Sequence, residues 1–329
     1  MILETERLIL RPWEETDAEE CYRYAKDPRV GPMAGWPVHT SMEESRRIIR
    51  EILAVPETYA VVLMETGLPV GSIGLHHNDL AEKEDEAELG YWLGVPYWGR
   101  GLVPEAAREV LRHAFEDLKL ERVWCGYYDG NEKSKRVQEK LGFKYQWTTE
   151  NAPVPQLGET RKGHVNLLTK ADWADMTVAC VPSFDDLWFR REMLEDEETM
   201  SYNHAWGGTI PFPKENWKDW YDFWIANPEG RRFYRYLKNP AGRFVGEIAY
   251  HYDGARRIYV ADVIVHAACR GIGYGGKGLE LLCESAKKNG ITVLHDDIAA
   301  DNPAKALFLG HGFREEYRTD EIVMLKKEL

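Results

Sequence analysis

The sequence predicts an α/β (α+β) protein with two tandem domains, each a mixed, mostly antiparallel central sheet flanked by helices. Its length of 329 residues exceeds one ordinary hydrophobic core and suits two domains of about 100–200 residues each. Landmarks of the first half recur in the second half in the same order. In both halves, strand-like alternation and helical periodicity follow one another in a common sequence of segments.

The recurrence is an internal duplication. VGSIGLHH (70–77) matches VGEIAYHY (245–252), WGRGLV (98–103) matches RGIGYG (270–275), and Asn131 before LGF (141–143) matches Asn302 before HGF (311–313). The period is far too long for a solenoid, so it indicates two domains rather than an array.

The boundary between the domains is predicted near residue 173. Residues 151–163 resemble a linker because of their prolines and glycines. Residues 164–170, however, still show the apolar–polar alternation of a strand. A boundary at 150 would separate this strand from the first domain. We therefore expect domains at 1–173 and 174–329.

Both domains are expected to contain the same elements. In the first half we expect strands at 5–11, 59–64, 70–77, 86–94 and 121–127 and helices at 16–27, 41–54, 101–117 and 131–141. In the second half we expect strands at 176–181, 231–237, 243–251, 257–265 and 291–298 and helices at 184–195, 214–226, 273–288 and 302–310. Each half closes with two more strands, and Thr16 and Ser183 are predicted helix N-caps.

The composition excludes several classes of protein. A hydrophobic fraction of 44%, without an export signal or an apolar run of the ~18 residues needed to cross a bilayer, predicts a cytoplasmic globular protein. Five widely spaced cysteines argue against a disulfide framework or a zinc site. The net charge of -13 disfavours a nucleic-acid partner and suits a cationic substrate. Histidines and the Asp296–Asp297 pair show no metal-ligand spacing, so no metal is expected.

Each glycine turn precedes a helix and is predicted to bind an anion. Glycines let a ligand approach the backbone, and the helix start offers free N–H groups and a positive dipole end. Phosphate or pyrophosphate is the expected ligand. A dinucleotide-binding fold is the rival interpretation, because Gly271, Gly273 and Gly276 fit GxGxxG and Asp296 follows about 20 residues later. Against it, several strands precede the turn, and WGRGLV lacks the fingerprint.

Strand order, the [QR]xxGx[GA] turn and the Asn…GlyPhe helix resemble the GNAT superfamily of N-acetyltransferases. The first half, with YWGRGLVPEA and NEKSKRVQEKLGF, resembles the ribosomal-protein alanine acetyltransferase branch (RimJ/RimL-like) over nearly all of residues 1–173. The second half resembles GNAT proteins in general over about 175–329, most clearly at RGIGYG.

The resemblance implies that acetyl-CoA is the co-substrate and that the turns bind its pyrophosphate. The strand end before each turn would hold the pantetheine arm, with one N–H polarising the thioester carbonyl. The implied cofactor-binding residues are Leu93, Val95, Trp98, Gly99, Arg100, Gly101, Leu102, Val103, Asn131 and Ser134 in the first half, and Val265, Arg270, Gly271, Ile272, Gly273, Tyr274, Gly275 and Asn302 in the second.

An amine must be neutral to attack a thioester, so a general base is useful. Glu88 is the candidate in the first half, although it also fits a surface role in the acidic run 82–88. Glu247 and Asp262 are the candidates in the second half, and Ser134 is a further candidate catalytic residue. Where the family often has a tyrosine acid, this chain has Gln138 and Phe308; a thiol with a pKa of ~8.5 can leave without a dedicated acid.

Acceptor specificity would come from the helical segments after each first strand. The second half has many aromatic residues there, and we expect most to pack the helix onto the sheet or onto the first domain, while one or two line a pocket for a cation or flat ring. They are Trp206, Phe212, Trp217, Trp220, Tyr221, Phe223 and Trp224.

The favoured function is an N-acyltransferase that moves acetyl from acetyl-CoA to a primary amine, either a protein N-terminus or a small amine, by direct attack. The alternative is an acyl-CoA-binding regulatory protein with one or both halves non-catalytic. A third possibility, aminoacyl transfer from tRNA by paired GNAT folds, is opposed by the acidic surface.

Overall fold

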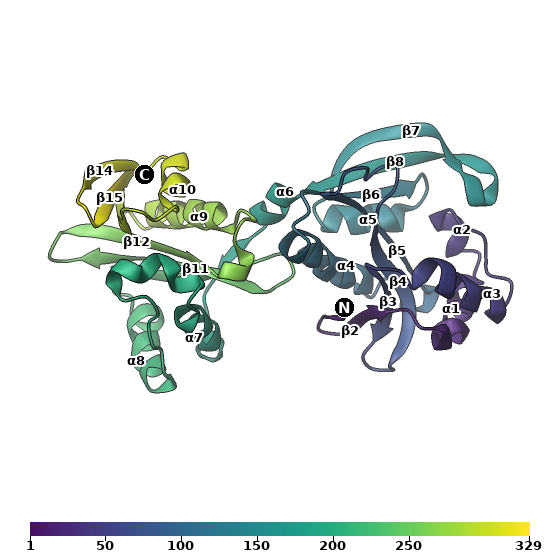
Figure 1. The fold of residues 1–329 in the computed structure, drawn as a ribbon, viewed down its shortest axis with the longest axis horizontal. Helices are drawn as coiled ribbons and strands as arrows, with labels where there is room; N and C mark the ends of the chain where they lie inside the picture. The colour runs from purple at the N-terminus through teal and green to yellow at the C-terminus, as the bar shows by residue number, and fades with distance from the viewer. The chain divides into compact units, whose positions relative to one another are not determined.

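A computed structural model describes the backbone of all 329 residues and every side chain except that of Ala205. The chain forms two compact units, Met1–Asp172 and Trp173–Leu329. Each unit contains one sheet with helices against it (Figure 1). The predicted fold class is therefore confirmed.

The first unit has an eight-stranded sheet in the order β1-β2-β3-β4-β5-β6-β8-β7. Only β5 and β6 pair in parallel. Its strands are β1 (Leu3–Glu4), β2 (Leu8–Pro12), β3 (Thr58–Leu63), β4 (Leu68–His76), β5 (Glu86–Leu93), β6 (Arg122–Tyr128), β7 (Lys144–Val154) and β8 (Glu159–Thr169). Its helices are α1 (Ala18–Ala25), α2 (Gly31–Ala34), α3 (Met42–Ile48), α4 (Leu102–Arg112) and α5 (Glu132–Lys140), with short turns η1 (Glu15–Asp17), η2 (Ile49–Leu53), η3 (Val95–Tyr97), η4 (His113–Asp117) and η5 (Pro155–Leu157).

The second unit has a seven-stranded sheet in the order β14-β15-β13-β12-β11-β10-β9, again with one parallel pair, β12 and β13. Its strands are β9 (Val178–Cys180), β10 (Arg232–Lys238), β11 (Phe244–Asp253), β12 (Ile258–Val265), β13 (Val293–Ala299), β14 (Arg314–Arg318) and β15 (Ile322–Glu328). Helix α6 (Lys170–Asp175) leads into it, followed by α7 (Leu187–Glu195), α8 (Trp217–Tyr221), α9 (Tyr274–Lys288) and α10 (Lys305–Gly310). It also has the 3-10 helices η6 (Phe184–Asp186), η7 (Thr199–Trp206), η8 (Lys214–Asn216) and η10 (Ala267–Cys269), and the π-helical segment η9 (Asp222–Ala226).

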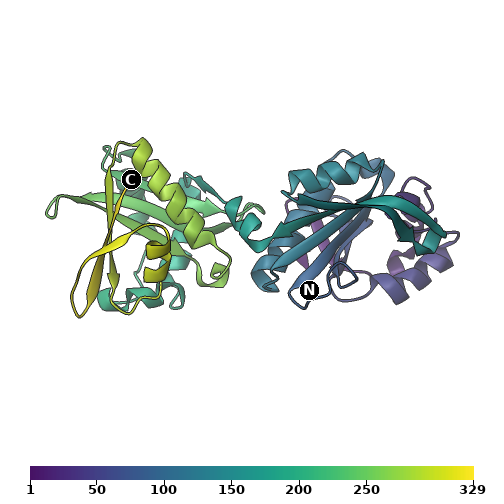
Figure 2. The same cartoon turned by 90° about the horizontal axis from the view of Figure 1, so that it is seen from above.

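Close packing between strands explains the glycine of the duplicated Val-Gly pair. A side chain at Gly71 would collide with the carbonyl oxygen of Trp92 on the neighbouring strand, and one at Gly246 would collide with that of Ile264. The same close approach therefore occurs in both units, just before the strand that ends at the glycine turn. Helix α9, which begins at that turn, lies along one face of the second sheet in Figure 2.

Two local expectations had different outcomes. Ser183 is the N-cap of η6, where its hydroxyl donates to Asp186 at 2.7 Å, as expected. Thr16 is wrong as a cap, because the N-cap is Glu14. The backbone N–H of Glu14 donates to Asp17 at 3.0 Å, and Arg11 also holds that carboxylate, which moves the start of the turn upstream.

The segment 151–163, whose composition resembles a linker, instead forms the tip of the β7–β8 hairpin. No described helix is long and apolar enough to span a membrane.

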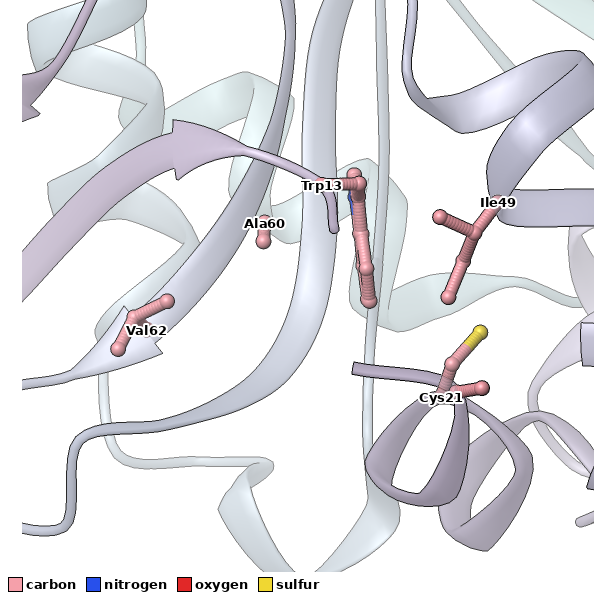
Figure 3. Close-up of a cluster of buried hydrophobic side chains, with 6 residues drawn as sticks. Trp13, Cys21, Ile49, Ala60 and Val62 are labelled. Carbon is pink, nitrogen blue, oxygen red and sulfur yellow. The ribbon is translucent and has the colours of Figure 1, made fainter. Parts of the chain in front are cut away.

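One part of the first core lies between the sheet and its N-terminal helices. Figure 3 shows the Trp13 ring beside Ile49 of η2 and Cys21 of α1, with Ala60 and Val62 on β3. All five are buried, and the Trp13 indole N–H donates to Ser72 at 3.0 Å. This cluster therefore attaches the helical segments to one face of the sheet.

We predict that Ile49→Ala destabilises the protein, because Ile49 is 0% exposed and its truncation leaves a cavity. The expected loss is about 2–5 kcal/mol in the free energy of unfolding, measured by urea denaturation. Ile52→Ala is the matched control, being in the same turn but 56% exposed. Equal losses in the two variants would contradict the assigned core.

Candidate active site

The second unit contains a cavity of about 1060 Å³ at the place where its two parallel strands separate. Strands β12 and β13 have one register pair, Val260 with His295. Beyond that pair, both strands contribute side chains to the cavity wall. The wall includes Arg190, Glu247, Asp262, Val265, Arg270, Gly271, Gly273, Tyr274, Gly275, Asp296 and Asn302.

The glycine turn forms one end of this cavity. Gly271 and Gly273 have φ values of +80° and +118°, which are readily adopted only by glycine, and α9 begins immediately afterwards. The N–H groups of a first helical turn have no partner within the helix, and the helix dipole favours an anion there. The turn therefore fits a phosphate or pyrophosphate group.

Buried side chains fix the turn in place. The Trp173 indole N–H donates to the Tyr274 hydroxyl at 2.7 Å, and both residues are buried. The guanidinium of Arg270 donates to the carbonyl of Thr199 at 2.6 Å. Arg270 is thus engaged with the η7 segment.

The cavity brings together most of the predicted site residues of the second half. Of the predicted cofactor residues, Val265, Arg270, Gly271, Gly273, Tyr274, Gly275 and Asn302 line it, whereas Ile272 is buried beside it. Both predicted bases, Glu247 and Asp262, also line the cavity. Asn302 accepts the N–H of Ala304 at 2.9 Å, so it also shapes the approach to α10.

Glu247 is held in a buried network. It is 3% exposed and accepts hydrogen bonds from the Arg190 guanidinium and the Tyr234 hydroxyl. Arg190 also lies over the Trp220 ring, 4.7 Å from its centroid. Both carboxylate oxygens of Glu247 already accept a hydrogen bond from the protein, so this geometry suits Glu247 to a supporting role.

Asp262 has a different environment. It lines the cavity, and 51% of its side chain is accessible. Desolvation within the cavity and the nearby Glu247 carboxylate raise the pKa of Asp262 to about 7. Its ionic neighbour is His251, at 3.8 Å, whose own pKa is lowered by burial. A carboxyl group that titrates near neutrality is suited to accept a proton.

The first unit repeats the turn with different supports. Gly99 and Gly101 have φ values of +76° and +78°, and α4 begins at Leu102. The Trp98 indole N–H donates to the Leu93 carbonyl at 2.7 Å, and Lys133 lies 3.9 Å from the Trp98 ring centroid. Among the other predicted cofactor residues, Val95 lies in η3, Arg100 in the turn and Val103 in the first turn of α4.

Asn131 and Ser134 belong to a polar network that connects α5 to the sheet. Asn131 caps α5 by accepting the Ser134 N–H at 3.2 Å. The Ser134 hydroxyl is 2.9 Å from the Tyr91 hydroxyl and accepts from Gln138 at 3.2 Å. Gln138, which replaces the expected tyrosine, also donates to the Gly126 carbonyl. Tyr91 was missed by sequence analysis, although strand alternation places it on the same face as Leu93.

Glu88 lies on β5 opposite His76. The Asn78 side-chain amide donates to it, and burial raises the pKa of the Glu88 carboxyl. Glu88 and Asp262 do not occupy equivalent positions. The two units can be aligned at the pairs Gly71–Leu93 and Gly246–Val265. Three residues further along each ladder, the second unit pairs Ala249 with Asp262, and the first unit pairs Gly74 with Gly90. The residue of the first unit that corresponds to Asp262 is therefore Gly90.

Phe308 and most of the aromatic residues singled out in the second half are packing residues or line the cavity. Phe308 is buried against Phe313, with ring centroids 5.1 Å apart, so it supplies no acid. Among the aromatic residues, four pack in one cluster of the second unit: Phe212, Trp217, Trp220 and Tyr221. Trp206 and Trp224 line the cavity, while Phe223 is exposed. Most of the set therefore packs, mainly against α7 and η7, and Trp220 and Trp224 also pack against residues of the sheet.

Similarity to known proteins covers both units. Residues 7–144 match the acetyltransferase (GNAT) domain, and residues 191–313 match the acetyltransferase (GNAT) family. The uncharacterized N-acetyltransferase YoaA of Bacillus subtilis is 30% identical over 148 residues, which are 44% of this chain and 82% of that protein. YdaF of Bacillus subtilis, provisionally named a ribosomal N-acetyltransferase, is 40% identical over 81 residues, 25% of this chain and 43% of that protein. A GNAT-family acetyltransferase structure from Bacillus anthracis aligns with a TM-score of 0.47 and 25% identity, covering 51% of this chain and 98% of that one.

The Asp296 carboxyl gives a pH-dependent prediction. Asp296 is 7% exposed, and burial, followed by the charges of Asp262 and Asp297, raises its pKa well above the ordinary value. The folded state then binds more protons than the unfolded state, so stability decreases as pH rises above the unfolded pKa of about 3.9. We predict that Asp296→Asn weakens this decrease, measured by urea denaturation between pH 4 and pH 7.

Asp320→Asn, at an exposed loop position, is the control and should retain the wild-type slope. Parallel slopes for wild type and Asp296→Asn would contradict the assigned environment of Asp296.

Proposed function

Because the chain belongs to the GNAT acetyltransferase family, we propose that it transfers an acetyl group from acetyl-CoA to a primary amine by direct attack, with the second unit as a catalytic centre. The observation that carries the proposal is one cavity that is lined both by the turn Arg270–Gly275 and by Asp262, a carboxyl group with a pKa of about 7. The turn proposed to bind acetyl-CoA and the carboxyl group proposed to accept a proton thus line the same cavity.

The turn residues have the donor-binding role. Backbone N–H groups from Gly271 to Gly275 would hold the pyrophosphate, and the strand end at Val265 would hold the pantetheine arm. Bound acetyl-CoA supplies an activated thioester. Trp173 and Thr199 fix the turn through Tyr274 and Arg270, so the N–H groups are preorganised for an anion.

Asp262 has the role of general base. The acceptor ammonium gives one proton to Asp262, which passes it to solvent, and the neutral nitrogen attacks the acetyl carbonyl carbon. The carbon–sulfur bond then breaks, and the second proton of the nitrogen goes to the departing thiolate. The products are the N-acetylated amine, CoA as its thiol and one proton.

For the first unit we propose the same reaction on a protein N-terminus or a small amine, with Glu88 as base and Ser134 near the donor. The partial likeness to YdaF supports an acceptor of the ribosomal-protein kind. The alternative is that this unit binds acyl-CoA without turnover. Gly90 at the position of Asp262 favours that alternative, as does Gln138 at the position of the expected tyrosine.

We predict that Asp262→Asn, in a full chain whose first turn is blocked by Gly101→Trp, lowers kcat by about 10²–10⁴-fold. The parent kcat/KM should rise with pH through about 7, because the carboxyl must lose its proton to act as base, and this inflection should disappear in the variant. The measurement is CoA release with a panel of primary amines. Asp320→Asn is the control, and an unchanged kcat in Asp262→Asn would exclude the assigned base.

We predict two acetyl-CoA sites in the full chain by isothermal titration calorimetry. Gly101→Trp and Gly273→Trp should each remove one site, because a bulky side chain at positive φ displaces the turn backbone. Gly158→Trp and Gly290→Trp are matched controls, with φ values of +65° and +79° and open space around them. A first unit that binds acetyl-CoA but releases no CoA with any amine would support the regulatory alternative for that unit.

A further inference from the structure

Several carboxylates line the second unit's cavity, and two of them are already paired with an arginine. Glu247 is paired with Arg190. Asp297 accepts from Arg256 at 2.7 Å. These two acids therefore have their charges balanced within the protein.

Asp262 and Asp296 differ from them. Among the described residues, neither carboxylate has a lysine or arginine partner, and Asp296 has no hydrogen-bond partner although it is 7% exposed. Both side chains line the cavity. A buried carboxylate without a partner, as at Asp296, is costly, and a cationic ligand in the cavity would supply the missing charge beside both acids.

The fold does not require these two acids, as the first unit demonstrates. Val260 pairs with His295 in the second unit, and the equivalent pair in the first unit is Glu88 with Trp124. Counting onward from these pairs, Asp262 corresponds to Gly90 and Asp296 to Cys125. The same strands therefore form without either carboxylate. The pair is thus a feature of this cavity and not of the sheet.

Aromatic rings complete the surroundings. Trp224, Tyr234, Tyr202 and Trp206 all line the cavity. The Trp224 ring lies 6.0 Å from that of Tyr234 and 6.0 Å from that of His251, close to Asp262. Aromatic faces attract organic ammonium groups, and they also pack well against methylene chains.

We propose that the acceptor of the second unit is a small organic polycation, a flexible molecule with two or more amines, whose reacting amine lies at Asp262 and whose second ammonium is paired with Asp296. This inference rests on the proposed acetyl transfer. A monoamine would lose its charge at Asp262 on reaction and leave Asp296 without a cation. A polycation keeps one charge at Asp296 while the reacting nitrogen becomes neutral, and the cavity of about 1060 Å³ accommodates such a chain beside the donor.

The test uses the full chain with Gly101→Trp, so that only the second turn is open to acetyl-CoA. Spermidine, n-butylamine and a short peptide with a free N-terminal alanine are compared by CoA release and by isothermal titration calorimetry. We expect one equivalent of spermidine to bind and its kcat/KM to exceed that of n-butylamine by about tenfold or more, the factor that 1.4 kcal/mol corresponds to. Asp296→Asn should raise KM for spermidine by about tenfold, an increase that should exceed any change in KM for n-butylamine.

Asp320→Asn controls for general loss of negative surface charge. Turnover of n-butylamine or the peptide, with no preference for spermidine and no effect of Asp296→Asn, would overturn the polycation inference and leave the acetyl transfer standing. Binding of spermidine that depends on Asp296, without CoA release from any amine, would overturn the proposed catalysis and the acceptor role with it. Spermidine binding that Asp296→Asn leaves unchanged would place the ligand on the acidic surface and refute the assigned site.

Discussion

The separation of two parallel strands is the constraint on which the site depends. Strands β12 and β13 pair at Val260 and His295 and then diverge toward the glycine turn. If they continued to pair, the ladder would close the space that the cavity occupies, and Asp262 and Asp296 would have no cavity to face. Backbone groups freed by the divergence must find partners in a ligand or in solvent. The interrupted ladder therefore has a cost in folding and creates the cavity that we propose as the binding site.

The buried pair of Arg190 and Glu247 supports that opening from one side. Both lie on the cavity wall, and Tyr234 donates a further hydrogen bond to Glu247. Desolvating an ion pair is expensive, and removal of one partner leaves an uncompensated charge. The pair also keeps a cation near Asp262, which opposes the rise in its pKa caused by burial and by Glu247. The same network thus shapes the wall and tunes the neighbouring carboxyl.

Sequence reasoning predicted the duplicated strands, both turns and their helices, because each of these depends on local periodicity and on glycine conformation. It could not rank Glu247 against Asp262. Alternation along one strand says nothing about Arg190, which comes from α7, or about Tyr234, which comes from β10. The sequence does not predict the isolation of Asp296, because this isolation depends on how β12 and β13 are placed together. Thr16 failed for a similar reason, because Arg11 and Glu14 determine which residue starts that turn.

The close approach at Gly71 and Gly246 affects how inactive variants of this protein should be interpreted. Neither glycine lines the cavity, yet a single methyl group at either position would push against a carbonyl oxygen of the strand that carries the candidate base. That strand also leads directly into the turn. A random search for loss of activity would therefore recover these two positions together with the ligand-facing residues. They would be mistaken for contacts with the donor unless folding and binding were measured separately.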